Sequence, residues 1–195
     1  MLVDFTVNQD SALLNRLRHG DREALSELYR VHHPAVYRFA LYLTADPAAA
    51  ADVTQDVFIW LMDHADRFDP NRGQLSAFLG GVARKFVSRS RMETRRFEVL
   101  PRDIELAAPL FATGAAPDTS RVPQLLRAIA ALPLRYREAV ALCDLEGKSY
   151  EEASAILECP VGTVRSRLHR ARGLLARKLE PEGLREGCYA QRVMP

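Results

Sequence analysis

The sequence contains few cysteines and has no long apolar run. Its 195 residues include three cysteines, an odd number without a CxxC pair, which argues against a disulfide framework and gives no ligand spacing for a zinc site. No apolar segment reaches the roughly 20 residues that span a bilayer, and residues 1–10 lack a signal sequence. We therefore expect a cytoplasmic protein with no membrane insertion, no bound metal and no cofactor.

Strand signals are also scarce, whereas apolar residues recur at helical spacing in most of the chain. The composition is 48% hydrophobic and 27% charged, which is ordinary for a globular protein. Periodicity fades and prolines accumulate over residues 97–121. The sequence predicts an all-α protein with two small helical domains, residues 1–96 and 122–180, joined by a flexible linker and followed by a tail over residues 181–195.

Capping residues, prolines and glycines mark the expected helix boundaries of the first domain. Asp21 is placed to cap a helix over residues 22–33, and Pro34 is expected to begin a new segment. Asp46 followed by proline predicts the start of a helix over residues 47–65. The adjacent glycines at 80–81 lie inside a later helix and are expected to allow a close helix crossing or a kink.

The net charge of +2 conceals a strong segregation of charge along the chain. Residues 46–69 contain six acidic side chains and one arginine, whereas residues 84–96 contain six basic side chains and one glutamate. Residues 165–178 contain six more basic side chains and no acidic one. Two basic stretches and a separate acidic one predict two nucleic-acid contacts and a third surface for a basic partner.

The last basic stretch lies in a pattern typical of a helix-turn-helix unit. Ser149 and Glu152 form a capping box for a short helix, residues 159–162 form a turn, and a long helix follows over residues 163–179. The apolar positions of the long helix would pack inward and leave a basic face for the major groove. The alternative is a solvated basic face on an ordinary core helix. The inward positions are Val164, Leu168, Ala171 and Leu175.

Two sets of motifs resemble one known family. Ser-Tyr-Glu-Glu-Ala at 149–153 and Cys-Pro-Val-Gly-Thr-Val-Arg-Ser-Arg-Leu at 159–168 resemble the promoter-reading region 4 of bacterial sigma factors of the extracytoplasmic-function (ECF) group. The first domain resembles that group's core-binding and promoter-melting region 2, in the same order along the chain. Its matching motifs are Gly20-Asp21, Leu28-Tyr29, Val36-Tyr37-Arg38, Asp52-Val53-Thr54-Gln55-Asp56-Val57-Phe58 and Phe68-Asp69-Pro70-Asn71-Arg72-Gly73.

The resemblance covers residues 10–96 and 122–180 and implies a function. A member of this group binds core RNA polymerase and directs promoter recognition, DNA melting and transcription initiation at a specific regulon. The resemblance also implies an anti-sigma factor as a partner and no enzymatic activity. The minus-35 contacts that it places on the last long helix are Thr163, Arg165, Ser166, His169, Arg170 and Arg172.

The acidic stretch is expected to form the polymerase contact. Helical spacing places three aspartates and one isoleucine on one face, which suits a partner carrying arginines; the alternative is an ordinary solvated face. In the family this surface binds the clamp helices of the largest polymerase subunits. The expected contacts are Asp52, Gln55, Asp56, Ile59 and Asp63.

Promoter melting requires phosphate neutralisation together with groups that receive unstacked bases. The resemblance implies that the helix over residues 75–96, with the loop before it, captures flipped bases of the minus-ten element. The chain departs from the family pattern at Phe78, which we expect to be a core residue, at Gly80-Gly81 and at Arg89, so the minus-ten sequence stays open. The expected minus-ten contacts are Asn71, Arg72, Arg84, Lys85, Ser88, Arg89 and Arg91.

Two other classes of function are alternatives to a sigma factor. A stand-alone helix-turn-helix regulator would use only the second domain to bind operators, but it leaves the acidic helix unexplained. A metal-dependent phosphohydrolase would use Asp52, Asp56 and Asp63, but these share one helix and lack the second acidic helix that such bundle sites use.

Overall fold

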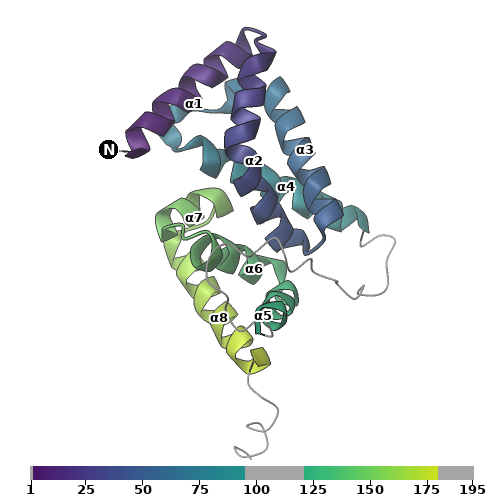
Figure 1. Ribbon diagram of the computed structural model, residues 1–195. Coiled ribbons are helices and arrows are strands. Elements are labelled where there is room, and N and C mark those ends of the chain that lie inside the picture. Colours follow the sequence, from purple (N-terminus) through teal and green to yellow (C-terminus); the bar gives the residue numbers. More distant parts are fainter. Residues whose placement is uncertain (1, 95–120, 180–195) are drawn as a thin grey trace, which may run out of the picture.

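The computed structural model describes residues 2–94 and 121–179, so the segment over residues 95–120 and the tail lie outside the described residues. The side chains of residues 2–8, 72, 91–94 and 121 are outside them as well. Every regular element in the described ranges is helical (Figure 1), which confirms the predicted all-α class with two helical domains. The first domain contains α1 (Leu2–Arg18), α2 (Arg22–Thr44), α3 (Pro47–Asp63) and α4 (Leu75–Thr94); the second contains α5 (Arg121–Ala130), α6 (Leu134–Val140), α7 (Tyr150–Leu157) and α8 (Val161–Leu179).

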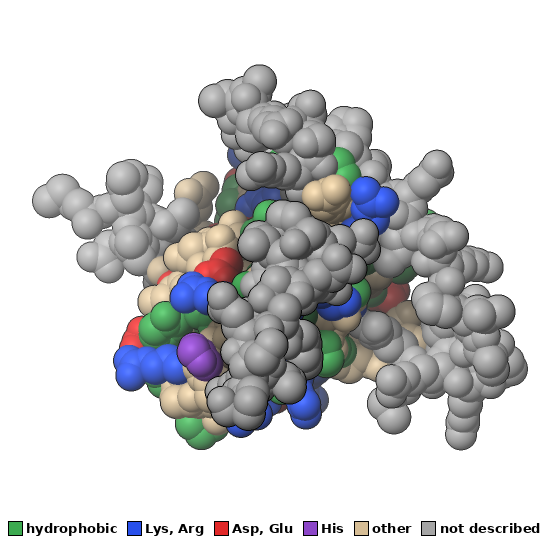
Figure 2. Space-filling model, turned by 90° about the horizontal axis from the view of Figure 1, so that it is seen from below, with side chains coloured by type: hydrophobic (Ala, Val, Ile, Leu, Met, Phe, Trp, Pro, Cys, Tyr) green, Lys and Arg blue, Asp and Glu red, His purple; other side chains and the backbone are tan. Residues whose placement is uncertain are grey.

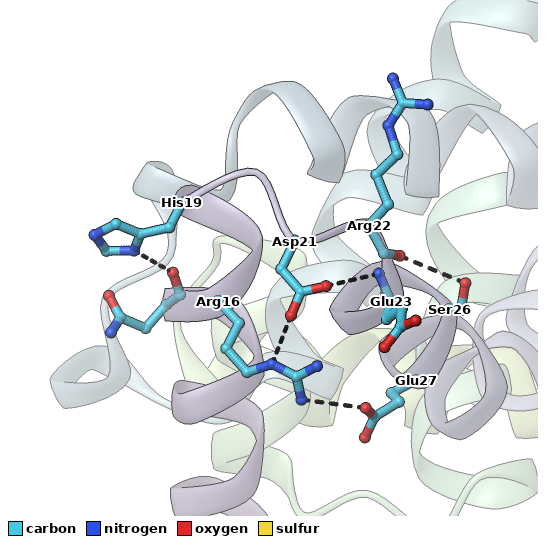
Figure 3. Close-up of polar contacts among 8 residues, drawn as sticks. Arg16, His19, Asp21, Arg22, Glu23, Ser26 and Glu27 are labelled. Atoms are coloured by element: carbon cyan, nitrogen blue, oxygen red, sulfur yellow. Dashed lines mark hydrogen bonds and ion pairs between the residues drawn. The ribbon is translucent and has the colours of Figure 1, made fainter.

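The turn between α1 and α2 is held by polar contacts of the predicted cap, Asp21. Its carboxylate accepts a hydrogen bond of 2.9 Å from the backbone N–H of Glu23, so it caps α2 as expected. Arg16 of α1 donates to this carboxylate at 2.8 Å and to Glu27 of α2 at 3.2 Å (Figure 3). These contacts join the two helices across a turn in which Gly20 has a φ of 87°.

The expected break at Pro34 is wrong, because α2 continues through this residue to Thr44. A proline inside a helix removes one backbone hydrogen bond and costs about 3 kcal/mol. Leu28, before the proline, and Val36 and Phe39, after it, are all buried in the same core. Burial of one continuous apolar stripe on both sides of the proline offsets this cost.

The helix-turn-helix unit of the second domain is present. Ser149 Oγ accepts a hydrogen bond of 3.1 Å from the N–H of Glu152, and the Glu152 carboxylate accepts one of 2.8 Å from the N–H of Ser149. This reciprocal pair confirms the predicted capping box. α7 ends at Leu157 and is capped by Glu158, whose φ is 51°; α8 begins at Val161, two residues before the predicted start.

Replacing Ser149 by alanine should lower the free energy of unfolding by about 1 kcal/mol, because α7 would lose one of its two capping bonds. Urea unfolding followed by circular dichroism measures this loss. Ser26→Ala is a matched control, since Ser26 is exposed within α2 and caps nothing. An equal loss for both variants would show that the capping box contributes nothing specific.

The two domains pack against each other where α7 crosses α4 (Figure 1). A Cβ atom added to Gly80 would lie 3.6 Å from Cγ2 of Ile156, and one added to Gly81 would lie 3.8 Å from the Ile156 carbonyl oxygen. The predicted close helix crossing is therefore present at this glycine pair. The core of the first domain continues through this contact into the second, where Ile156 is 3% exposed.

Candidate functional site

The acidic face predicted on α3 is exposed to solvent. Val53, Val57 and Leu61 point into the core of the first domain, whereas Ile59, on the opposite side of the helix, is 48% exposed. The carboxylates therefore lie on the solvent-exposed side of α3, around the accessible side chain of Ile59. The other exposed members of this face are Asp52, Gln55, Asp56 and Asp63.

Sequence reasoning missed two apolar residues beside this face. Met62 is 45% exposed, and its position three residues after Ile59 is a signal that could have identified it. Tyr29 of α2 is 44% exposed, and its ring lies 4.8 Å from that of Phe58 on α3. Their accessible area adds to the apolar surface that a partner of α3 could cover.

Two basic residues of α4, Arg84 and Lys85, contact carboxylates of the second domain. Arg84 Nε donates to Glu138 Oε1 of α6 at 2.9 Å, and Lys85 Nζ lies 2.7 Å from Oε1 of Glu158 at the end of α7. Burial raises the pKa of Glu138, although the nearby Arg84 opposes this shift. The sequence pattern indicated the basic face of α4, but not that the carboxylates of Glu138 and Glu158 would contact it.

The other predicted minus-ten residues lie in the 3₁₀ turn before α4 and in the C-terminal half of α4. Asn71 is exposed in the 3₁₀ turn Pro70–Arg72, where its side-chain amide donates to Asp69 at 3.1 Å. Ser88 is half-buried on α4, and Arg89 is exposed. The side chains of Arg72 and Arg91 are outside the described residues.

Phe78 has the core role that the sequence predicted. It is half-buried against the core of the first domain, and its ring centroid lies 5.5 Å from that of Phe68 and 5.9 Å from that of Trp60. These ring contacts pack α4 against Trp60 of α3 and against Phe68 in the segment before α4.

The long helix α8 separates its apolar and polar residues as predicted. The inward residues are all buried, at 9% exposure or less, while the opposite face is exposed. Seen from the end where the second domain lies, basic side chains emerge at several places among apolar and uncharged atoms (Figure 2). The buried set is Val164, Leu168, Ala171 and Leu175, and the exposed set is Arg165, Ser166, His169, Arg170 and Arg172, with Thr163 half-buried.

Two arginines of α8 are held by residues outside the helix. The Arg165 guanidinium lies 5.4 Å from the ring centroid of Tyr150, at the start of α7. Arg172 forms a two-bond ion pair with Asp144, with Nη2 at 2.5 Å and Nε at 3.2 Å from the carboxylate oxygens. Asp144 reaches Arg172 from a π-helical turn, Ala141–Leu145, that extends α6. The guanidinium of Arg172 is therefore already partly engaged by a carboxylate.

The described ranges, residues 2–94 and 121–179, contain no cluster of side chains suited to a metal ion. In the same ranges no helix is long and apolar enough to cross a bilayer. Cys143 and Cys159 are free and half-buried, and burial raises the pKa of the Cys143 thiol. Cys188 lies outside the described residues.

Comparison with known protein families matches both domains. The family model of sigma-70 region 2 matches residues 28–97, and that of sigma-70 region 4 matches residues 123–175. Together these two models define the class as sigma-70-type sigma factors.

Relatives and solved structures narrow this class further. The ECF sigma-E factor of Escherichia coli K12 is 33% identical to this chain, over 88% of this chain and 95% of the relative. The ECF sigma factor SigC of Mycobacterium tuberculosis is 32% identical, over 89% of this chain and 93% of the relative. SigE of Mycolicibacterium smegmatis is 36% identical over 78% of this chain, which spans only 62% of that relative.

Sigma factor RpoE of Bartonella quintana, solved with the anti-sigma factor NepR, is 27% identical with a TM-score of 0.65, over 80% of this chain and 97% of that one. CnrH, solved with the cytosolic domain of CnrY, is 26% identical with a TM-score of 0.66, over 89% of this chain and 99% of the CnrH chain.

The chain belongs to the ECF group of RNA polymerase sigma factors. Proteins of this family direct promoter recognition by RNA polymerase and are not enzymes.

Proposed function

We propose that α3, α4 and α8 carry the three contacts through which this sigma factor starts transcription. α3 binds core RNA polymerase, α4 with the turn before it captures the minus-ten element, and α8 reads the minus-35 element. The observation that carries the proposal is the division of exposed charge. The acidic face of α3 lies on one domain and the arginine face of α8 on the other, so polymerase and DNA do not compete for one surface.

The polymerase contact combines attraction between opposite charges with apolar burial. Ile59 and Met62 give the face an accessible apolar centre, and the carboxylates around it attract a basic partner. The residues proposed to bind core polymerase are Asp52, Gln55, Asp56, Ile59 and Asp63.

The minus-ten contact is assigned to exposed and basic residues around α4. Basic side chains neutralise phosphates, while Asn71 and Ser88 offer hydrogen bonds to unstacked bases. The remaining proposed contacts are Arg72, Arg84, Lys85, Arg89 and Arg91.

The minus-35 contact uses the first turns of α8, where a recognition helix reaches base edges. Arg165 can bind guanine through two hydrogen bonds, and Ser166 can serve either donor or acceptor edges. Thr163, His169 and Arg170 complete the proposed readout, with Arg172 positioned through Asp144.

The domain boundaries, location and partners follow from the same proposal. Residues 1–96 and 122–180 form the two domains, and the chain acts in the cytoplasm without enzymatic activity. The relative solved with an anti-sigma factor supports such a partner for this chain too. A stand-alone helix-turn-helix regulator is not favoured, because a region 2 match occupies the first domain.

Footprinting of core polymerase loaded with this chain tests the proposal on promoter DNA. We expect protection of two segments centred about 25 base pairs apart, which is about 85 Å along B-DNA, and permanganate-reactive thymines in the downstream segment. Protection without reactive thymines, at a site also bound without polymerase, would contradict the sigma assignment and favour an operator-binding regulator.

A further inference from the structure

Arg18, the last residue of α1, contacts backbone that lies 47 and 50 residues further along the chain. Its Nε and Nη2 donate to the carbonyl oxygen of Ala65 at 3.1 and 2.8 Å, and Nη2 also donates to the carbonyl oxygen of Phe68 at 3.1 Å. Hydrogen bonds from a charged donor are stronger than those between neutral groups. One guanidinium therefore joins both ends of the 3₁₀ turn Ala65–Arg67 to α1.

The turn that Arg18 holds leads directly into the predicted minus-ten loop. The carbonyl of Phe68 and the N–H of Asp69 belong to one planar peptide unit, so fixing this carbonyl also orients the start of the next turn. Asp69 Oδ1 then accepts hydrogen bonds from the backbone N–H of Asn71 at 2.9 Å and from its side-chain amide at 3.1 Å. A continuous set of contacts thus runs from α1 to the exposed side chain of Asn71.

Phe68 is held through its side chain as well as through its backbone. It is 5% exposed, and its ring centroid lies 5.5 Å from that of Phe78 on α4. α1 therefore holds the carbonyl of this residue while α4 holds its ring. Because both supports meet at Phe68, the orientation of the following loop relative to α4 depends on α1.

A direct contact with a DNA phosphate is the alternative role for Arg18, which also has exposed surface. A lysine could replace the arginine in a phosphate contact, since it carries the same charge. It lacks the planar fork of donors that reaches two carbonyl oxygens in a fixed geometry. The two roles therefore give opposite expectations for a lysine variant.

We propose that Arg18 is a positioning residue for minus-ten recognition, which fixes the backbone at residues 65 and 68 so that Asn71 presents its amide to an unstacked base in one orientation. This inference rests on the proposed function, in which Asn71 contacts the minus-ten element. An amide carries both a donor and an acceptor, so its orientation decides which base it accepts. α1, which carries none of the proposed DNA contacts, thereby sets a base preference of the minus-ten contact.

Nuclear magnetic resonance of the free full-length protein tests the positioning directly. In Arg18→Gln we expect the backbone and side-chain amide resonances of Asn71 to shift by more than their line widths. Arg16→Gln is the matched control, because it also removes one positive charge from α1, but its partners, Asp21 and Glu27, lie at the turn between α1 and α2. It should leave the Asn71 resonances in place. Arg18→Lys serves the same test if the glutamine variant does not fold.

The base preference of core polymerase loaded with each variant tests the consequence for recognition. The probe is fork DNA whose non-template single strand is randomised, and sequencing of the bound fraction gives the preference at each position. Asn71→Ala identifies the position that Asn71 reads. There, Arg18→Gln and Arg18→Lys should both reduce the preference about fivefold, the factor that one hydrogen bond of ordinary strength supplies. The preference at other positions, the affinity for core polymerase and the behaviour of Arg16→Gln should match the wild-type chain.

Unchanged Asn71 resonances in a folded Arg18 variant, or an equal shift in Arg16→Gln, would overturn the proposal. A uniform loss of affinity for all sequences that lysine restores would also overturn it, because that result identifies a phosphate contact. Equal losses of preference at every position would reduce Arg18 to a general stabilising residue. An unaltered preference in Asn71→Ala would instead reject the proposed minus-ten role of Asn71. The resonances of the free protein distinguish that failure from a failure of Arg18 to hold the loop.

Discussion

Replacing Asp52 and Asp56 by lysine should weaken the association of this sigma factor with core RNA polymerase by at least about 100-fold. Both carboxylates are exposed on α3 beside the accessible Ile59, so their reversal changes the partner surface and not the core. Each reversal replaces an attraction to a basic partner by a repulsion, and like-charge contacts in an interface cost several kcal/mol. A loss of 100-fold corresponds to about 2.8 kcal/mol.

Fluorescence titration of labelled sigma factor with core polymerase measures this loss. The matched control reverses Glu23 and Asp66, two exposed acids of the same domain that lie outside the α3 face. Both double variants change the net charge equally, so only the position of the charge differs. Normal polymerase affinity of the Asp52 and Asp56 variant, or equal losses in both, would contradict the assignment of α3.

Arg165→Ala should cost about 1 to 3 kcal/mol of binding free energy at the minus-35 element and relax the preference for one or two bases. Arg165 lies near the start of α8, and the ring of Tyr150 supports its guanidinium at 5.4 Å. A side chain already held in place loses less conformational entropy when it binds a base edge. Removing it should therefore affect sequence readout more than general affinity.

Arg177→Ala provides the contrast, because Arg177 lies in the last turn of α8, beyond the turns that fit in the major groove. Its loss should weaken all DNA sequences about equally and reduce the salt slope by about one. Binding of both variants to promoter and scrambled DNA over a series of salt concentrations separates the two roles. Equal, sequence-independent losses would show that α8 supplies phosphate charge only.

The local structure of this protein could be predicted from short-range signals. The caps Asp21 and Ser149 act within three residues of their own position, so the chain around them determines the helix start. The inward face of α8 likewise follows from spacing alone, because the residues at 164, 168, 171 and 175 lie on one side of any α-helix.

Long-range packing accounts for what could not be predicted. Pro34 normally ends a helix, but burial of α2 on both sides of it keeps the helix continuous. Periodicity shows which face of α4 is polar, but not that Glu158, 73 residues away from Lys85, would contact it. The ion pair of Arg172 with Asp144 depends on the π-helical turn after α6, for which the sequence offered no signal.

Run-off transcription with purified core RNA polymerase on a genomic promoter library tests the central claim most directly. Core polymerase with this sigma factor should produce discrete transcripts that core polymerase alone does not, and the Asp52 and Asp56 reversal should abolish them. The mapped start sites should share two upstream elements. Absence of any transcript that depends on the chain, under conditions where a known ECF sigma factor is active, would contradict the account.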